Sequence, residues 1–189
     1  MSDTWFISDP HFGHASMLKF ERDDGTLLRP QFTNADEMDD FIITQHNATV
    51  KPTDKVYILG DIAMKKRFLP KVLQLNGRTR LIMGNHDIFG FKEYAKYFGE
   101  VYHMRTLPGE GIMMTHIPTH IESIKRGWVN VHGHLHANIV GADQQMVEGD
   151  LSIQHPKYYN VCVEHHNYTP VNMEIIRDKV KALKIDNLT

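Results

Sequence analysis

Seven residues of types that bind metal ions occur at the ends of five short apolar segments of this sequence. They are two aspartates, one asparagine and four histidines: Asp9, His11, Asp61, Asn85, His116, His134 and His136. They occur in the motifs Asp9-Pro10-His11, Gly60-Asp61, Gly84-Asn85-His86-Asp87, Thr115-His116 and Gly133-His134-Leu135-His136. A set of nitrogen and oxygen ligands without a thiolate suits Mn²⁺, iron, Zn²⁺ or Ni²⁺. Seven ligands exceed what one tetrahedral ion needs, so the pattern predicts two divalent transition-metal ions.

Two metal ions held by such residues indicate a particular reaction. A carboxylate has two oxygens and can bridge both ions. Ions roughly 3.5 to 4 Å apart can stabilise the attacking and leaving oxygens of an in-line displacement at phosphorus, and they can also activate water near neutral pH. The chemistry that fits these residues is therefore the hydrolysis of a phosphate ester.

The spacing within the motifs supports this interpretation. Residues two apart in extended backbone point to the same side, so Asp9 with His11, and His134 with His136, can each grip one ion. The glycines of three motifs, Gly60, Gly84 and Gly133, precede candidate ligands, and a residue without Cβ allows a sharp turn and close approach to the backbone.

Each candidate also has an ordinary structural interpretation. Asp and Asn residues after a strand commonly cap turns, so Asp9, Asp61 or Asn85 alone would more often be turn residues than ligands. Independent turn caps have no reason to coincide with four histidines at strand ends, and the joint pattern therefore favours the metal site. His132 is expected to be structural, because it should point away from the pair that follows it.

The elements that must position these residues alternate between strands and helices, which predicts the α/β class. Strands are expected at residues 4–8, 55–59, 80–83, 100–103, 111–115, 128–132 and 159–163. Helices are expected from about residue 34, where Asn34 to Glu37 resembles a capping box, and at residues 68–75, 91–98 and 173–183. Ligands collect at the carboxyl ends of strands in such sheets, so the five motifs can converge on one site.

The composition is that of an ordinary globular protein. The chain has 189 residues, 41% hydrophobic and 23% charged, with a formal net charge of -2. We expect a single domain over residues 1–189, and no charge-driven binding to nucleic acid or membranes. The lone Cys162 lies in an apolar segment and is expected to be a buried thiol. No segment resembles a signal peptide or a transmembrane helix, and this favours a cytoplasmic protein.

With all five motifs in order, the sequence resembles the calcineurin-like metallophosphoesterases. The opening Ser8 to His14 and the late segment Asn160-Val161-Cys162-Val163-Glu164 are similar to the short phosphoesterases of bacteria and their phages. The resemblance covers nearly the whole chain. It implies a four-layer α/β/β/α sandwich of two mixed sheets flanked by helices, with the metal ions at one rim.

The resemblance also implies roles for individual residues. The first ion would be bound by Asp9, His11 and His136, and the second by Asn85, His116 and His134, with Asp61 bridging both. His86 would be the catalytic histidine, oriented by Asp87, while a bridging hydroxide attacks phosphorus. Two further histidines, His14 and His120, are weaker candidates for contact with the substrate.

The segment after Asp61 lacks the Asp-Arg pair of protein Ser/Thr phosphatases, which argues against that branch of the family. We expect a small, nucleotide-like phosphodiester or phosphomonoester, and Mn²⁺ is the favoured metal. The alternatives are a phosphodiesterase that processes nucleic acid and a non-catalytic scaffold with the same fold.

Overall fold

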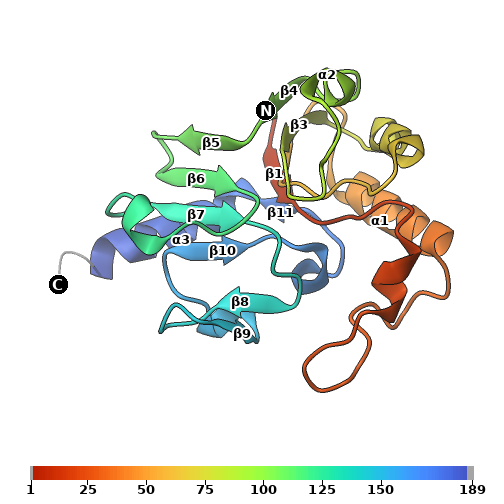
Figure 1. The fold of residues 1–189 in the computed structure, drawn as a ribbon. Helices are drawn as coiled ribbons and strands as arrows, with labels where there is room; N and C mark the ends of the chain where they lie inside the picture. The colour runs from red at the N-terminus through yellow and green to blue at the C-terminus, as the bar shows by residue number, and fades with distance from the viewer. Residues whose placement is uncertain (1, 187–189) are drawn as a thin grey trace.

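Two β-sheets form the centre of the protein, in a computed structural model that describes residues 2–186 (Figure 1). The first sheet has the order β11-β1-β2-β3-β4. Its strands are β1 (Thr4–Ile7), β2 (Lys55–Ile58), β3 (Arg78–Ile82), β4 (Glu100–Tyr102) and β11 (Val171–Asn172). The second sheet has the order β10-β7-β6-β5. Its strands are β10 (Tyr158–Asn160), β7 (Val129–His132), β6 (Ile112–Thr115) and β5 (Met104–Leu107).

Parallel pairing makes the strand ends meet. Strands β1 to β4 run parallel, with Ile7 opposite Ile58 and Ile58 opposite Leu81, and only β11 is antiparallel in this sheet. Strands β6, β7 and β10 are also parallel to one another, while β5 is antiparallel to β6. The carboxyl ends of the parallel strands therefore lie together at one edge of each sheet.

A separate two-stranded hairpin lies beneath β10 in Figure 1. It consists of β8 (Asn138–Val140) and β9 (Met146–Glu148), with Val140 opposite Met146. The amide of Asn160, on β10, donates to the carbonyl oxygen of Asn138 at 2.8 Å and so fixes the start of the hairpin to the second sheet.

The two sheets share an apolar core. The residues buried in it come from strands of both sheets and from the last helix: Phe6, Tyr57, Leu59, Ile82, Ile112, Met114, Val129, Val131, Val161, Val171, Met173, Ile176, Val180 and Leu183. Side chains alternate along a strand, so the neighbours of these residues on β1 and β2, such as Ile7 and Ile58, face a second cluster under the first helix.

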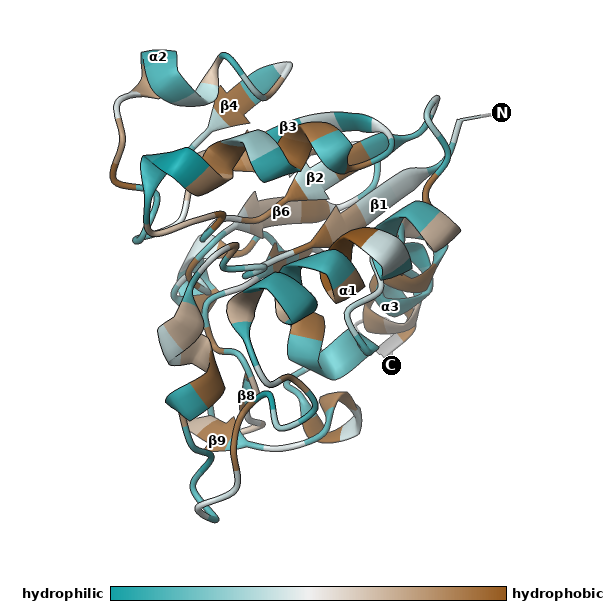
Figure 2. Cartoon of the chain, turned by 90° about the vertical axis from the view of Figure 1, so that its right-hand side faces the viewer, coloured by the Kyte–Doolittle hydropathy of each residue, from teal (hydrophilic) through white to brown (hydrophobic). Residues whose placement is uncertain are grey.

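Helices flank the sheets. Figure 2 shows α1 (Ala35–Thr49) lying over the first sheet with alternating brown and teal residues along its length. Its buried Met38 and Ile42 belong to the cluster that contains Ile7 and Ile58. The remaining helices are α2 (Phe91–Tyr94) and α3 (Met173–Asp186), with the 3-10 helices η1 (Ala15–Lys19), η2 (Lys66–Gln74), η3 (Ile121–Ser123), η4 (Leu151–Ile153) and η5 (Val163–His166).

The start of α1 follows from its sequence. The Asn34 side chain accepts a hydrogen bond from Glu37 N at 2.9 Å, which is the contact expected of a helix N-cap. The Glu37 carboxylate accepts from the backbone N–H of Thr33 at 2.8 Å, one residue earlier than in a regular capping box. Both ends of the motif therefore satisfy backbone donors.

The α/β class and the two flanked sheets agree with the sequence-based expectation. All seven expected strands exist, with boundaries that move by no more than three residues. Residues 66–74 form a 3-10 helix instead of an α-helix, and Pro70 inside it lacks the N–H that an α-helix would use. The helix expected at 91–98 stops at Tyr94, and β5, β8, β9 and β11 were not anticipated. Within residues 2–186, no helix is long and apolar enough to cross a bilayer.

Candidate metal centre

The five motifs meet where strands of both sheets end. Asp9 follows β1, Asp61 follows β2 and Asn85 follows β3, all in the first sheet. His116 follows β6, and His134 and His136 follow β7, in the second sheet. Side chains separated by up to 127 positions in the chain are thereby brought into one cluster.

The first half of this cluster is formed by Asp9, His11 and His136. One ligand atom of each lies within 4.8 Å of the others. Asp9 Oδ1 is 3.7 Å from His11 Nε2 and 3.9 Å from His136 Nε2. Both Asp9 Oδ1 and His11 Nε2 are buried without a hydrogen-bond partner. Unpartnered buried atoms of this kind are costly unless a cation binds between them, so the donor set fits a metal ion.

The second half is formed around His116. Its Nδ1 lies 2.6 Å from the carbonyl oxygen of Leu59, and this acceptor requires a proton on Nδ1. Its Nε2 then points at two oxygens, Asn85 Oδ1 at 2.9 Å and Asp61 Oδ1 at 3.4 Å. The His134 ring lies 5.2 Å from the His116 ring, measured between centroids. A nitrogen facing two oxygens again suits a cation.

Asp61 reaches both halves with different oxygens. Its Oδ2 is 3.6 Å from His11 Nε2, whereas its Oδ1 is 3.4 Å from His116 Nε2. The side chain is 2% exposed, so it is held between the two groups of histidines. This is the geometry that a bridging carboxylate needs.

The backbone at these residues is strained. Five of the seven expected ligands have positive φ angles, between 50° and 70°: Asp9, His11, Asp61, His134 and His136. Residues other than glycine rarely adopt this conformation, and each instance costs about 1 to 3 kcal/mol and persists only where the surroundings enforce it. Strain of this kind gathers at functional sites, where the fold holds side chains in a required position.

Two glycines allow the loops to approach one another. Gly60 has a φ of +93°, and a Cβ at this position would lie 2.6 Å from both Gly84 N and His116 Nδ1. A Cβ on Gly133 would collide with the Ser8 and Asp9 side chains. The glycines in these motifs are therefore required by close packing, as expected from the sequence.

The electrostatics of the cluster favour positive charge. Burial lowers the pKa of His116, but the neighbouring carboxylates of Asp61 and Asp9 outweigh burial and raise it to about 9. Burial raises the pKa of Asp9, but the histidines His11, His116 and His136 bring it well below its usual value. The aspartates therefore remain anionic and stabilise a cation between the rings.

His86 and Asp87, the expected catalytic pair, lie beside the cluster in different ways. The His86 ring is 5.8 Å from the His11 ring between centroids, and its backbone N–H donates to Asp61 Oδ1 at 2.9 Å. Asp87 accepts from the backbone N–H of Asp61, Ile62 and Gly84 at 2.8 to 3.1 Å. Its hydrogen bonds in the described part of the chain go to these loops, and the expected contact with the His86 imidazole is not among them.

Two residues without an expected role support the first half of the cluster. Glu164 Oε1 is 2.9 Å from His136 Nδ1 and accepts from the Arg29 guanidinium at 2.7 and 2.9 Å. Arg29 is fully buried and also donates to the carbonyl oxygen of Asp9 at 2.7 Å. Burial raises the pKa of Glu164, but Arg29 and His136 lower it strongly, so this carboxylate is ionised. Of the two residues, only Glu164 lay in a segment that the sequence singled out.

The environment of Asp9 Oδ2 was also not anticipated in detail. This oxygen accepts from Ser8 Oγ at 2.6 Å, from His134 N at 2.9 Å and from the Cys162 thiol at 3.2 Å. Cys162 is buried, as expected. His132 is also buried, with Nδ1 2.9 Å from the carbonyl oxygen of Gly133, which agrees with its expected structural role.

The two weaker candidates, His14 and His120, are associated with different candidate ligands. His14 is partly exposed, and its Nδ1 is 3.5 Å from His11 Nδ1. His120 is exposed and lines a cavity that His134 also lines. The structure therefore places His14 beside the candidate ligand His11, and His120 in the same cavity lining as the candidate ligand His134.

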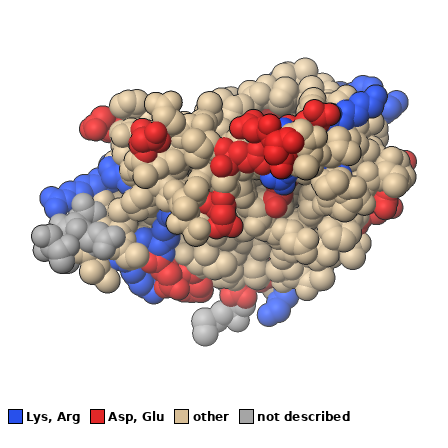
Figure 3. All heavy atoms as spheres, turned by 90° about the horizontal axis from the view of Figure 1, so that it is seen from below, with Lys and Arg blue, Asp and Glu red and all other residues tan. Residues whose placement is uncertain are grey.

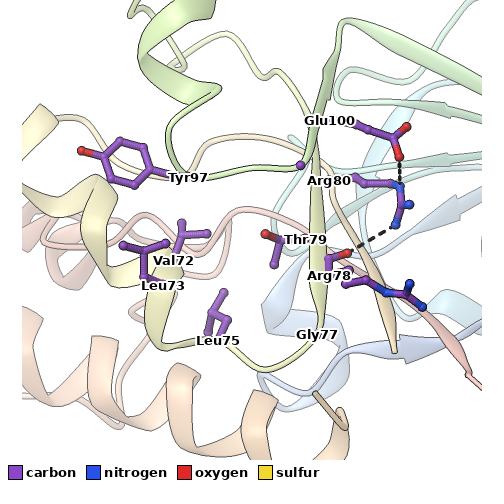
Figure 4. A pocket seen from close by; sticks show the side chains of 10 residues that line it. Val72, Leu73, Leu75, Gly77, Arg78, Thr79, Arg80, Tyr97 and Glu100 are labelled. Carbon is purple, nitrogen blue, oxygen red and sulfur yellow. Dashed lines mark hydrogen bonds and ion pairs between the residues drawn. The ribbon is translucent and has the colours of Figure 1, made fainter. Parts of the chain in front are cut away.

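A different hollow, shown in Figure 4, lies at the amino end of β3. It is lined by residues of η2 and by Gly77, Arg78 and Arg80, and Arg80 pairs with Glu100 at 2.7 Å. The candidate ligands follow the carboxyl ends of the strands, so this hollow lies away from the metal centre and contains none of its residues.

Comparison with known proteins agrees with this geometry. The sequence profile described as calcineurin-like phosphoesterase matches residues 3–183. "Uncharacterized protein MJ1445" of Methanocaldococcus jannaschii is 32% identical over 190 residues, which cover 98% of this chain and 95% of that protein. The "Gene 66 protein" of Mycobacterium phage L5 is 34% identical over 92 residues, or 46% of this chain and 41% of the phage protein. A protein of unknown function from Aquifex aeolicus, AQ665, has a crystal structure with a TM-score of 0.63 at 26% identity, covering 100% of both chains.

Proposed function

The chain belongs to the calcineurin-like phosphoesterase family, and from this premise we propose that it hydrolyses a small phosphate ester with two divalent metal ions. The family and the candidate ligands point to divalent metal ions as cofactors. Mn²⁺ is the ion that we propose first, and Fe, Zn²⁺ and Ni²⁺ suit the same nitrogen and oxygen ligands.

The position of Asp61 carries this proposal. One oxygen of this carboxylate faces His11 and the other faces His116, so a single side chain would hold both ions. Asp9, His11 and His136 would complete one site, and Asn85, His116 and His134 the other. Two ions so placed would supply Lewis acidity toward the phosphoryl oxygens and an activated hydroxide as nucleophile.

The chain's own residues would act around this pair. His86 is partly exposed beside His11, so its imidazole can donate a hydrogen bond to a phosphoryl oxygen or protonate the leaving oxygen. Asp87 accepts hydrogen bonds from the backbone N–H groups of Asp61 and Gly84 and thereby fixes the positions of the Asp61 carboxylate and of the loop that carries His86. The buried carboxylates of Asp9 and Asp61 would keep the cations in place.

A small substrate suits the surroundings of the site better than a nucleic acid does. The cavity that borders both His134 and His136 is lined by Glu21, Asp23 and Glu148, with Arg22 as the counter-charge. Figure 3 shows acidic side chains gathered on the face seen from below. Carboxylates beside the site repel a polyanionic backbone, which favours a substrate with few phosphates.

Reconstitution with Mn²⁺ followed by assays on bis-p-nitrophenyl phosphate and p-nitrophenyl phosphate tests the proposal. We expect about two ions per chain and turnover of at least one ester. Asp61→Asn should lose ions and reduce turnover by about a hundredfold or more. Asp40→Asn, which changes an exposed acid on α1, is the matched control and should behave as the wild type.

Two experimental outcomes would contradict the proposal. A chain that binds metal ions but shows no turnover with Mn²⁺, Fe²⁺, Zn²⁺ or Ni²⁺ would be a non-catalytic scaffold. Turnover of single-stranded oligonucleotides in preference to both chromogenic esters, with affinity falling steeply as salt increases, would instead support the nucleic-acid alternative.

A further inference from the structure

A second cavity, of about 420 Å³, opens beside the candidate metal centre. Its lining comes from the loop after β6, which includes Ile117 and His120, and from the β8–β9 hairpin, which includes Met146. His134 and Leu135 also line the cavity. Because His134 is a candidate metal ligand, a phosphate ester bound at the metal centre would extend directly into this cavity.

The lining of the cavity is neutral. Its residues are Ile117, Pro118, Thr119, His120, Ile121, His134, Leu135, Val140, Gln144, Met146 and Tyr158. Within residues 2–186, no Asp, Glu, Lys or Arg belongs to this lining. The neighbouring cavity shares His134, Leu135 and Met146 with this one, and it also contains Glu21, Arg22, Asp23 and Glu148. A charged group would lose hydration in the neutral cavity without gaining a charged partner, so the cavity suits an uncharged group.

Two of the residues that line the cavity have exposed apolar side chains. Ile117 is 50% exposed and Met146 is 67% exposed. Apolar surface beside a ligand site is stabilised when a ligand covers it, and the flexible thioether of Met146 adapts to ligands of different shape. His120 and Gln144 add polar atoms that could orient a heteroatom of an otherwise apolar group.

The wall formed by the β6 loop is held in place. The Thr119 backbone N–H donates to Asn130 Oδ1 at 3.0 Å, and its carbonyl oxygen accepts from Tyr158 Oη at 2.8 Å. Thr115 Oγ1 also donates to the carbonyl oxygen of Ile117 at 2.7 Å. The buried amide of Asn130 thus fixes the loop before any ligand binds, and a preformed wall reduces the entropy lost on binding.

From these observations we propose that the cavity between Ile117 and Met146 binds the organic group of the substrate, and that this group is uncharged and largely apolar, such as an aromatic ring. The inference rests on the proposed function, because it places the phosphorus at the metal centre. It makes Ile117 and Met146 specificity-determining residues, and Met146 also lines the neighbouring acidic cavity.

Equilibrium binding to the Mn²⁺-loaded protein tests the inference without turnover. We would titrate phenylphosphonate and methylphosphonate, which share the phosphonate and differ in the group that should enter the cavity. The wild type should bind phenylphosphonate about tenfold more tightly than methylphosphonate. The double variant Ile117→Asn, Met146→Asn should lose this preference while its affinity for methylphosphonate stays unchanged. Both positions are exposed, so the fold should tolerate the changes.

Ile175→Asn is the matched control, since Ile175 is 49% exposed on α3 and does not line the cavity. This variant should keep the preference for phenylphosphonate. A wild type that binds both phosphonates equally, or a double variant that keeps the preference, would overturn the inference while leaving the proposed function intact. Binding of neither phosphonate, together with no ester turnover, would overturn the proposed function and the inference with it.

Discussion

At the residue scale, two candidate ligands, His136 and His116, are each oriented by a hydrogen-bond partner that is distant in the sequence. Glu164 contacts Nδ1 of His136, so the proton stays on that nitrogen and Nε2 is presented toward Asp9. Leu59 fixes His116 in the same way through its carbonyl oxygen. The side chain of Glu164 is 1% exposed and takes its counter-charge from Arg29. A buried carboxylate of this kind both orients the ring and adds negative charge near the cation.

Neutralising Glu164 should therefore weaken metal binding. We expect Glu164→Gln to reduce the affinity for Mn²⁺ about 10- to 100-fold, because outer partners of metal-binding histidines have effects of this size. Titration of the metal-free protein with Mn²⁺ against a chromophoric chelator measures the change. Glu110→Gln, which breaks the more exposed ion pair between Glu110 and Arg177, should leave the affinity unchanged. Equal losses in both variants would show that Glu164 acts only through stability.

At the element scale, α1 is stabilised by its own first turn. Asn34 accepts from Glu37 N, and removing such a cap typically costs about 1 kcal/mol. Asn34→Ala should lower the free energy of unfolding by about this amount, whereas Thr44→Ala, at an exposed position inside the helix, should change it by less than about 0.5 kcal/mol. Urea denaturation distinguishes the two. An unchanged midpoint for Asn34→Ala would mean that the Glu37 contacts with Thr33 suffice.

His46, also on α1, should make stability depend on pH. Its Nε2 is 2.9 Å from the carbonyl oxygen of Asn76, its Nδ1 is buried without a partner, and burial lowers its pKa below the usual 6.5. The unfolded state therefore binds the proton more readily, and the stabilisation present above pH 6.5 is lost as pH falls toward the lower folded pKa. One such group contributes at most about 1.4 kcal/mol per pH unit.

The test compares unfolding free energies at pH 7.5 and pH 5.5. His46→Gln keeps a donor for Asn76 but cannot titrate, so its loss on acidification should be about 1 kcal/mol smaller than that of the wild type. His103→Gln, at an exposed position, should lose as much as the wild type. Parallel losses in all three proteins would show that His46 does not contribute to the acid sensitivity.

The elements also show what a sequence can predict. Strand ends and their motifs were predictable because an apolar segment followed by Gly-Asp or Gly-Asn-His is a local signal. The α/β class followed from the same segments and is confirmed. Arg29 carried no such signal, because its partner Glu164 is 135 positions away and only the fold brings them together. The short strands β8 and β9 were missed, and their length alone is not the reason, because β4 and β10 are also three residues long and were predicted.

At the scale of the whole molecule, the candidate metal centre joins the two sheets. Asp61 comes from the first sheet and His116 and His134 come from the second, so an ion bound between them would link both halves of the core. Five of the candidate ligands have left-handed backbone, and the aspartates lie close together. A cation bound between the aspartates would offset the repulsion between their two carboxylates.

Metal binding should consequently stabilise the entire protein. A ligand present at a hundred times its dissociation constant adds about 2.7 kcal/mol to the free energy of unfolding, which for a chain of this size corresponds to a rise in Tm of about 5 to 10 °C. Calorimetry with Mn²⁺ and with a chelator measures this difference. Asp61→Asn should have nearly the same Tm in both conditions, because it loses the carboxylate that faces both groups of histidines, while Asp40→Asn should retain the full rise. A wild-type Tm that does not respond to Mn²⁺, Fe²⁺, Zn²⁺ or Ni²⁺ would mean that the strained loops hold their geometry for some purpose other than binding these ions.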